Sequence, residues 1–467
     1  MKRGWKTAIA LLVVSPGFSQ SYEDLFRQAA AAVAQGDYRA AAARYEAALK
    51  LRPEAVEALS NLGVMYHTLG RYSDAVQVLK RAVAAQRDLG PANLILGIDL
   101  VHMNQPADAI APLQRALAAD PRNRDAALAL AGARVAINDL EGASLIYRQQ
   151  TDRAPGDKEA WYGLAVCYER MAEAASRQLA HIENSGAWSK RFLGEFLLAR
   201  GEGRLAMEAL TEAYTKDPGQ PGLEKLLQFA QWRVEGRPEG EGKPPEVDWS
   251  ELPSNQNTPG SVYRRARELA QLSRRAFERF VEIDPDSWQS NLFLGDVNRQ
   301  RRNFPEAIQH YEAAAQKNPQ TPAPFVGLGT VYWELGQFDR AEPYLREVLK
   351  RNPNSYQALF ALGDIATRQQ RNEEGIELLT RCIELDPERP AAHASLGRAL
   401  LHAGRYAEAV THLEVARSMD TYGDIHFQLS QALKQLGRAG ESAQAMEQSA
   451  RIRKEQLQRE IRLRGGK

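Results

Sequence analysis

The feature that most constrains this chain is a repeat of 34 residues. Small residues recur at that interval in two series, Ala29, Gly63, Gly97, Ala131 and Ala165, and then Gly295, Gly329, Gly363 and Gly397. A fixed period of this size is typical of solenoids, in which each repeat buries its apolar face only by stacking on its neighbours. The chain is therefore predicted to be a stack of small repeated units rather than one domain around a single core.

Within each repeat, the spacing predicts two helices joined by a tight turn. With the first small residue as position 8, large residues favour positions 4, 7 and 11, which share one helix face at about 100° per residue. A second small residue stands at position 20 and a large one at position 24, so two helices can approach closely. The turn is marked by glycine at position 15, in Gly70, Gly336, Gly404 and Gly437. A proline at position 32 ends most units, because proline cannot continue a helix. The expected fold is all-α.

These positions resemble the tetratricopeptide repeat (TPR) family over nearly all of residues 22–457, in about twelve units. The resemblance implies an α-α superhelix, a solenoid of antiparallel helix hairpins. The sequence departs from the family pattern in places. Arg87 and Thr421 replace the closing proline, and the unit that starts near Asp424 lacks the small residue at position 8.

Two units in the middle are shorter than the others. Residues 158–186 and 259–287 each form a unit of 29 residues, and the first has no turn glycine between Trp161 and Ile182. Loss of the turn predicts that the two helices of such a unit fuse into one longer helix. A further helix is expected to begin at Pro221-Gly222-Leu223 and to reach about Trp232.

Composition shifts predict the domain boundaries. Residues 233–260 contain five prolines and four glycines, which is typical of an irregular linker. We therefore expect an N-terminal solenoid at 20–232, a linker at 233–258, a C-terminal solenoid at 259–457 and a basic tail at 458–467.

The first nineteen residues read as a signal peptide. Three basic residues precede a short apolar run at 7–14, and small residues at Gly17 and Ser19 suit a cleavage site. The run is shorter than the roughly 20 residues that cross a bilayer, so an uncleaved anchor is the weaker alternative. The sequence thus predicts export to a periplasmic or extracellular location, with no integral membrane segment in the mature chain.

Several function classes are disfavoured. A formal net charge of +1 argues against a nucleic-acid partner. Phosphate-binding loops and hydrolase motifs are missing from the sequence, so no cofactor is predicted and the protein is expected not to be an enzyme. His67 and His102 lack a third ligand, so no metal is predicted either. Cys167 and Cys382 are interpreted as packing residues.

The partner surface is predicted from helix geometry and the resemblance together. Positions 2, 6, 9 and 13, flanked by 5 and 12, point away from the packed face. In the TPR family the first helices line a concave groove. The N-terminal half offers there an apolar stripe of Leu94, Ile95, Ile98, Val101, Leu128 and Val135. The C-terminal half offers a mostly charged set of Asp296, Arg299, Trp333, Asp364, Arg368, Arg398 and His402.

The favoured hypothesis is a non-enzymatic scaffold that binds peptide or helical segments of a protein partner in this groove, in the assembly of an extracytoplasmic complex. The alternative is a regulatory or substrate-presenting subunit of an envelope enzyme or secretion machine. The apolar stripe is either a binding surface or is covered by the linker or by the chain's own helices. The Lys/Asn set with which some TPR domains hold a peptide C-terminus is missing from the sequence, which disfavours a chaperone-tail adaptor.

Overall fold

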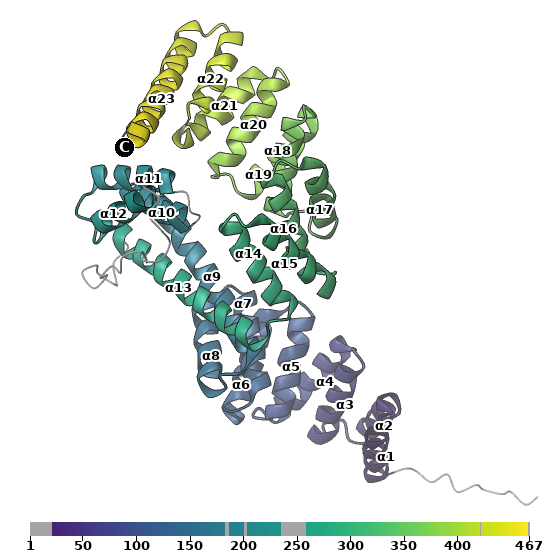
Figure 1. The fold of residues 1–467 in the computed structure, drawn as a ribbon. Coiled ribbons are helices and arrows are strands. Elements are labelled where there is room, and N and C mark those ends of the chain that lie inside the picture. The colour runs from purple at the N-terminus through teal and green to yellow at the C-terminus, as the bar shows by residue number, and fades with distance from the viewer. Residues whose placement is uncertain (1–20, 183–185, 200–202, 235–257, 421, 466–467) are drawn as a thin grey trace, which may run out of the picture. The chain divides into compact units, whose positions relative to one another are not determined.

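The computed structural model describes residues 21–182, 186–199, 203–234, 258–420 and 422–465, and every regular element in them is a helix. The first half of the chain contains α1 Tyr22–Ala34, α2 Tyr38–Leu51, α3 Val56–Thr68, α4 Tyr72–Ala85, α5 Gly90–His102, α6 Pro106–Ala119, α7 Arg124–Ala136, α8 Leu140–Arg153, α9 Lys158–His181, α10 Gly186–Ala199, α11 Gly203–Lys216 and α12 Leu223–Val234. The second half contains α13 Pro259–Ile283, α14 Trp288–Gln300, α15 Phe304–Lys317, α16 Ala323–Glu334, α17 Phe338–Arg351, α18 Tyr356–Arg368, α19 Asn372–Leu385, α20 Pro390–His402, α21 Tyr406–Ala416, α22 Asp424–Gln435 and α23 Ala439–Gly465, with a short 3-10 helix at Arg417–Met419 (Figure 1).

The predicted hairpins are confirmed, and the turn at position 15 has a single geometry throughout. Its residue adopts a left-handed conformation with φ between 58° and 76°. Glycine accepts this conformation without strain, whereas other residues pay a steric cost. The turn residues are Gly36, Gly70, Asn104, Asn138, Arg302, Gly336, Gln370, Gly404 and Gly437.

The small residue at position 8 is explained by the large residue at position 24. A Cβ atom added to Gly329 on α16 would lie 2.6 Å from Cγ of Leu345 on α17. Gly295 faces Tyr311 in the same way, and Gly397 faces Leu413. Each large side chain therefore occupies the volume that a side chain at position 8 would need, which brings the two helices of a hairpin into close contact.

Stacking of hairpins joins these contacts into continuous apolar cores. In the N-terminal repeats one cluster extends from Ala29 on α1 to Ala133 on α7, and Leu59, Leu79 and Leu113 are fully buried within it. In the C-terminal repeats two clusters extend from Ala307 to Ala392 and from Ile376 to Ala445. Burial of this kind, repeated from unit to unit, is the stabilisation expected of a solenoid.

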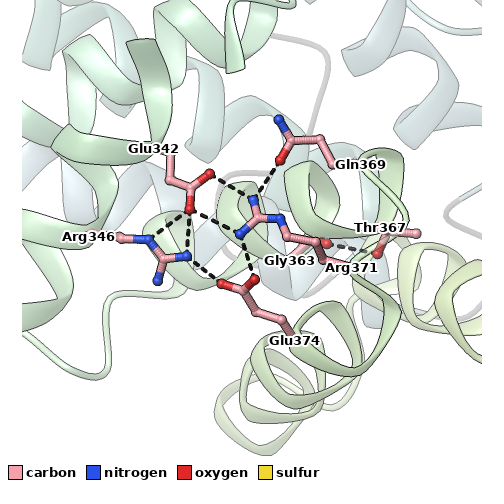
Figure 2. Close-up of polar contacts among 7 residues, drawn as sticks. All are labelled: Glu342, Arg346, Gly363, Thr367, Gln369, Arg371 and Glu374. Atoms are coloured by element: carbon pink, nitrogen blue, oxygen red, sulfur yellow. Dashed lines mark hydrogen bonds and ion pairs between the residues drawn. The ribbon is translucent and has the colours of Figure 1, made fainter. Parts of the chain in front are cut away.

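Ion pairs add a second connection between consecutive repeats. Arg371, in the turn between α18 and α19, donates to Oε1 and Oε2 of Glu342 on α17 at 3.1 and 2.7 Å and to Glu374 on α19 at 2.6 Å. Arg346 on α17 contacts the same two glutamates, at 2.8 Å to Glu342 and 2.5 Å to Glu374 (Figure 2). This closed set of four charges holds α17 and the α18–α19 hairpin together.

The predicted fusion of helices in the short units is confirmed. Helix α9 runs without interruption for 24 residues and helix α13 for 25. Ser273 Oγ on α13 donates to the carbonyl oxygen of Ala165 on α9 at 3.1 Å, in a buried position. Near the opposite ends of the two helices, Leu179 packs with Val262 and Tyr263. The helix expected from residue 223 is also present, as α12.

The chain divides into two compact units. Unit 1 contains residues 1–173 and 269–276, and unit 2 contains residues 174–268 and 277–467. The division falls inside α9 and α13. The predicted signal peptide and all but residues 233, 234 and 258 of the predicted linker lie outside the described residues. Helix α23 continues past residue 457, where the basic tail was predicted to begin, to Gly465.

No helix among the described residues combines the length and the apolar character that are needed to cross a bilayer.

The contact between positions 8 and 24 makes a prediction about stability. Gly329→Leu is expected to lower the free energy of unfolding by about 1–3 kcal/mol, because it overpacks a closed helix contact. Gly132→Leu is the matched control, since a Cβ there meets nothing within 4 Å. It should be neutral or stabilising by up to about 1 kcal/mol, because glycine is a poor helix former. Thermal melts followed by circular dichroism would show the ranking, and equal melting temperatures would refute this account of the repeat.

Candidate functional site

Several of the predicted charged side chains meet around the carboxylate of Asp364. Asp364 lies on α18 and is 2% exposed. Its Oδ2 accepts hydrogen bonds from the indole Nε1 of Trp333 on α16 at 2.9 Å and from Nε of Arg368 at 2.6 Å. Its Oδ1 accepts from Arg398 on α20 at 2.5 Å, and Ser395 Oγ lies 3.5 Å from the same atom. One buried carboxylate therefore connects the first helices of three successive repeats.

This geometry changes the role of Asp364. The helical pattern predicts that position 9 faces a partner, but the neighbouring first helices cover it, so the carboxylate does not itself form a contact surface. A buried carboxylate is stable only when charged or polar donors satisfy it, and here two arginines and an indole do so. Asp364 is therefore a positioning residue for Trp333, Arg368 and Arg398.

The preceding repeats contain two further polar contacts on the same surface. Tyr311 on α15 donates its hydroxyl to Oδ1 of Asp296 on α14 at 2.6 Å. Burial raises the pKa of Asp296, and the hydrogen bond from Tyr311 partly opposes this. Arg299 on α14 forms an ion pair with Glu334 on α16 at 2.8 Å. The Asp296 contact therefore lies within one hairpin, whereas the Arg299 ion pair connects that repeat to the next.

A cavity of about 430 Å³ lies beside this network. It is lined by Arg302, Trp333, Glu334, Gly336, Phe338 and Arg368. Trp333 and Arg368 were predicted as site residues, whereas the other four were not. Arg302 could have been noticed, because it occupies position 15, where the repeat favours glycine; its φ is 60°. Asn104, Asn138 and Gln370 share this conformation, so the departure from glycine marks Arg302 only together with its place on the cavity wall.

Two predicted residues of the charged set lie farther along α20. Arg398 is half-buried and reaches Asp364, and His402 is exposed one turn beyond it. Partial burial lowers the pKa of His402, and the nearby Arg398 guanidinium lowers it further. Neither residue lines the cavity.

The apolar stripe of the N-terminal repeats is less exposed than the sequence predicts. Leu94 and Ile95 on α5 pack partly against the core, and Ile98 is half-buried as well. On α7, Leu128 and Val135 are also half-buried. Val101, with 38% of its surface exposed, is the one exposed member of this set. Helix stacking, which a single-helix projection does not include, covers the rest.

The two histidines with repeat spacing lie in a cluster on α3, α4 and α5. Nδ1 of His67 lies 2.5 Å from Oδ1 of Asp99, which is fully buried. The ring of Tyr72 stacks on His102 with a centroid distance of 4.4 Å. Burial raises the pKa of Asp99, and the contact with His67 opposes this rise. Among the described residues, no three His, Cys, Asp or Glu side chains are placed to bind a metal ion.

Both cysteines are buried within the repeats. Burial raises the pKa of Cys167 to about 11 and that of Cys382 to about 12. Because the thiolate is the reactive form, these values favour the packing role that the sequence predicts.

A histidine pair lies between α20 and α21. Nε2 of His393 donates to the carbonyl oxygen of Pro387 at 2.9 Å, so its Nδ1 is left to accept from Nδ1 of His412 at 2.9 Å. Burial lowers the pKa of His412, and His393 lowers it further, while Glu408 has the opposite effect. The folded protein therefore favours the neutral form of His412.

The family comparison covers most of the repeats. Models described as tetratricopeptide repeat match residues 26–91, 100–167, 260–322, 326–387, 366–421 and 423–456. The matches leave out the segment between residues 167 and 260, which contains most of α9 and the helices α10 to α12.

Individual relatives are distant. The chain is 27% identical over 153 residues to Protein CTR9 homolog of Arabidopsis thaliana, covering 32% of this chain and 14% of that protein. It is 24% identical over 361 residues to Cellulose synthase operon protein C of Pseudomonas fluorescens, covering 69% of this chain and 28% of that protein. The chain thus spans less than a third of the length of either relative. Among solved structures, yeast Tom70 matches with 15% identity, 95% coverage of both chains and a TM-score of 0.32.

The burial of Asp364 makes the first prediction for this site. Asp364→Ala should lower the free energy of unfolding by about 3 kcal/mol, because two guanidinium groups lose their shared buried partner. Arg368→Ala should cost about 1 kcal/mol or less, since its side chain is half exposed and Asp364 keeps Arg398 and Trp333. Urea denaturation would compare the two variants. A larger effect of the Arg368 variant would contradict the role of Asp364 as the centre of the network.

The histidine pair predicts a loss of stability in acid. The pKa of His412 lies below its ordinary value of 6.5 in the folded state, so protonation favours unfolding. The contribution of His412 to the free energy of unfolding is fully present above about pH 6.5 and is lost as the pH falls through the lowered pKa. The melting temperature of His412→Gln should therefore fall less than that of the parent protein between about pH 7.5 and pH 5, with a difference on the order of 1–2 °C. Identical losses would show that the pair does not sense pH.

Proposed function

Because the chain belongs to the tetratricopeptide repeat family, we propose that it is a non-enzymatic scaffold that binds peptide or helical segments of a protein partner. The proposed binding surface is formed by the first helices of the C-terminal repeats, α14, α16, α18 and α20. In the groove predicted from the family, these helices present their positions 12 and 13 to a partner, together with Arg398 at position 9 of α20. We call this the first-helix surface.

The observation that carries the proposal is the network around Asp364. It anchors one atom each of Trp333, Arg368 and Arg398, while the rest of these side chains remains partly accessible. Side chains fixed before binding lose less conformational entropy when a partner arrives. A surface of this kind suits the recognition of a folded or extended segment.

The same geometry argues against a catalytic role for this carboxylate. Asp364 already accepts from two guanidinium groups and an indole, so it is poorly placed to take a proton from a substrate. The raised pKa values of Cys167 and Cys382 argue against nucleophilic catalysis by either thiol. A non-enzymatic scaffold is the function most consistent with both observations.

We further propose that the protein acts outside the cytoplasm, in the assembly of an envelope or secreted complex. Support comes from residues 1–19, whose basic start, apolar run and small residues match an export signal. Fusion of this segment to alkaline phosphatase, which is active only after export, tests the location. An inactive fusion would leave the scaffold proposal in place and remove its extracytoplasmic part.

A second candidate is a regulatory or substrate-presenting subunit of an envelope enzyme or secretion machine. It is favoured by one observation, the match of 69% of this chain to a relative named for a cellulose synthase operon. The two candidates differ in the partner. An enzyme recovered in a constant ratio to the scaffold would support the second candidate.

Partner capture tests the scaffold proposal. The tagged full chain would be expressed in its source cells and cross-linked before lysis, with the variants Trp333→Ala and Leu94→Ser/Ile98→Ser/Val101→Ser as parallel baits. We expect a partner whose recovery falls by about tenfold with Trp333→Ala, a change of about 1.4 kcal/mol in binding. Recovery that falls only with the triple variant would move the site to the N-terminal repeats. A bait that enriches no protein above an unrelated control would contradict the proposal, provided that melting temperatures are unchanged.

A further inference from the structure

The cavity beside Asp364 has two basic walls and an aromatic lining. Arg302, in the turn after α14, and Arg368, at the end of α18, both contribute to its surface. Trp333 and Phe338 supply large aromatic surfaces between them. Glu334 also lines the cavity, but its carboxylate is paired with Arg299 at 2.8 Å. The cavity therefore combines two arginines and one paired glutamate with two aromatic rings.

Arg368 is oriented for anion binding. Its Nε donates to the buried Asp364 at 2.6 Å, which fixes the direction of the guanidinium plane. In the part of the chain that the structure describes, its two terminal nitrogens form no hydrogen bond, and half of the side chain is exposed. A planar guanidinium held in this way can present two parallel N–H donors to a carboxylate.

Arg302 lines the cavity although its backbone adopts a left-handed conformation that favours glycine. Its φ of 60° belongs to a turn position at which Gly336 and Gly404 stand in other repeats. A side chain in this conformation costs roughly 1–2 kcal/mol relative to a right-handed one. The guanidinium lies over the ring of Phe304, 5.8 Å from its centroid, close to the cavity that it lines. Because Asn104, Asn138 and Gln370 adopt the same conformation in other repeats, it is the place of Arg302 on the cavity wall, and not the turn, that connects it with the site.

We propose that this cavity binds an acidic side chain of a partner peptide, with an adjacent aromatic or large aliphatic side chain against Trp333 and Phe338. Arg368 would hold the carboxylate and Arg302 would add positive charge. The inference rests on the proposed scaffold function and specifies the partner segment. A volume of about 430 Å³ lies within the roughly 300–1,000 Å³ of ligand pockets.

The charge and the aromatic lining of the cavity together favour such a peptide over a free inorganic anion. A free inorganic anion would use the arginines but leave the aromatic walls without a partner, and burial of apolar surface there is favourable. A basic segment would meet two unfavourable charges. An acidic residue next to a large apolar one satisfies both parts of the cavity.

The test uses the purified full chain and an array of short peptides with blocked ends, so that side chains supply every carboxylate. The peptides place each pair of residue types at two central positions in a Ser/Gly background. We expect retention of pairs that join Glu or Asp to Phe, Trp or Leu, and replacement of that Glu by Gln should weaken binding at least about tenfold. Fluorescence anisotropy with the best peptide then measures the dissociation constant for each variant.

Variants separate recognition from folding. Arg368→Gln should weaken binding of the acidic peptide at least about tenfold and abolish the preference for Glu over Gln. Arg302→Gly should also weaken binding, and because glycine suits the turn, its melting temperature is measured alongside to show that the variant is folded. Gln370→Gly is the matched control: it changes the same turn position two repeats further along the chain, outside the cavity, and should raise the melting temperature without changing binding. Arg405→Gln, which removes an exposed arginine elsewhere, should leave binding unchanged.

Each other outcome overturns the assignment. Peptides that bind without an acidic preference, or equally to Arg368→Gln, would place recognition elsewhere and leave the scaffold function standing. Displacement of the peptide by millimolar inorganic phosphate at constant ionic strength would indicate a general anion site. If no peptide is retained but the full chain still captures a partner in cells, the cavity inference alone fails. If neither binds, both the cavity inference and the scaffold proposal fail.

Discussion

The contact between a small residue at position 8 and a large one at position 24 is the constraint on which the rest of this structure depends. In the hairpins with glycine at position 8, the second helix inserts a leucine or tyrosine where the first helix has no side chain, as Leu345 does against Gly329 and Leu413 against Gly397. This sets the distance between the two helices, so every repeat presents nearly the same shape to its neighbours. Stacking of equal shapes then places equivalent positions of successive first helices on a common surface, which is where the Asp364 network and the cavity are found.

Polar contacts act on this apolar framework in two different ways. Around Arg371 and Glu342, four partly exposed charges connect consecutive repeats at the start of the second helices (Figure 2). Exposed pairs of this kind contribute little individually, and a closed set contributes more because its side chains are already ordered. Around Asp364 the carboxylate is buried, so its donors are needed to compensate the loss of hydration. The first network joins repeats, whereas the second orders side chains that a partner could contact.

The candidate site also shows where a repeat departs from its own local preferences. Position 15 favours glycine, yet Arg302 adopts the left-handed turn and lines the cavity. Position 20 favours alanine, yet Gly375 stands there, and a Cβ on it would lie 2.6 Å from Oγ1 of the buried Thr367. The second departure is explained by packing, since Thr367 needs the space. In the first departure, the Arg302 guanidinium lies over the ring of Phe304, 5.8 Å from its centroid, on the wall of the cavity.

The sequence alone determined the helix hairpins, their turns and the fusion of two helices in each short unit, because these follow from spacings of a few residues within one repeat. The family, and the role of Gly329 and its equivalents, were predictable for the same reason. Only the tertiary structure decided that Asp364 is buried, that Leu94 and Ile98 are half covered, and that Arg302 reaches the cavity. Each of these outcomes depends on which side chains of the adjacent repeat lie next to the residue in question. Helical periodicity shows the direction in which a side chain leaves its own helix, whereas burial and the formation of a cavity depend on the neighbours that lie in that direction.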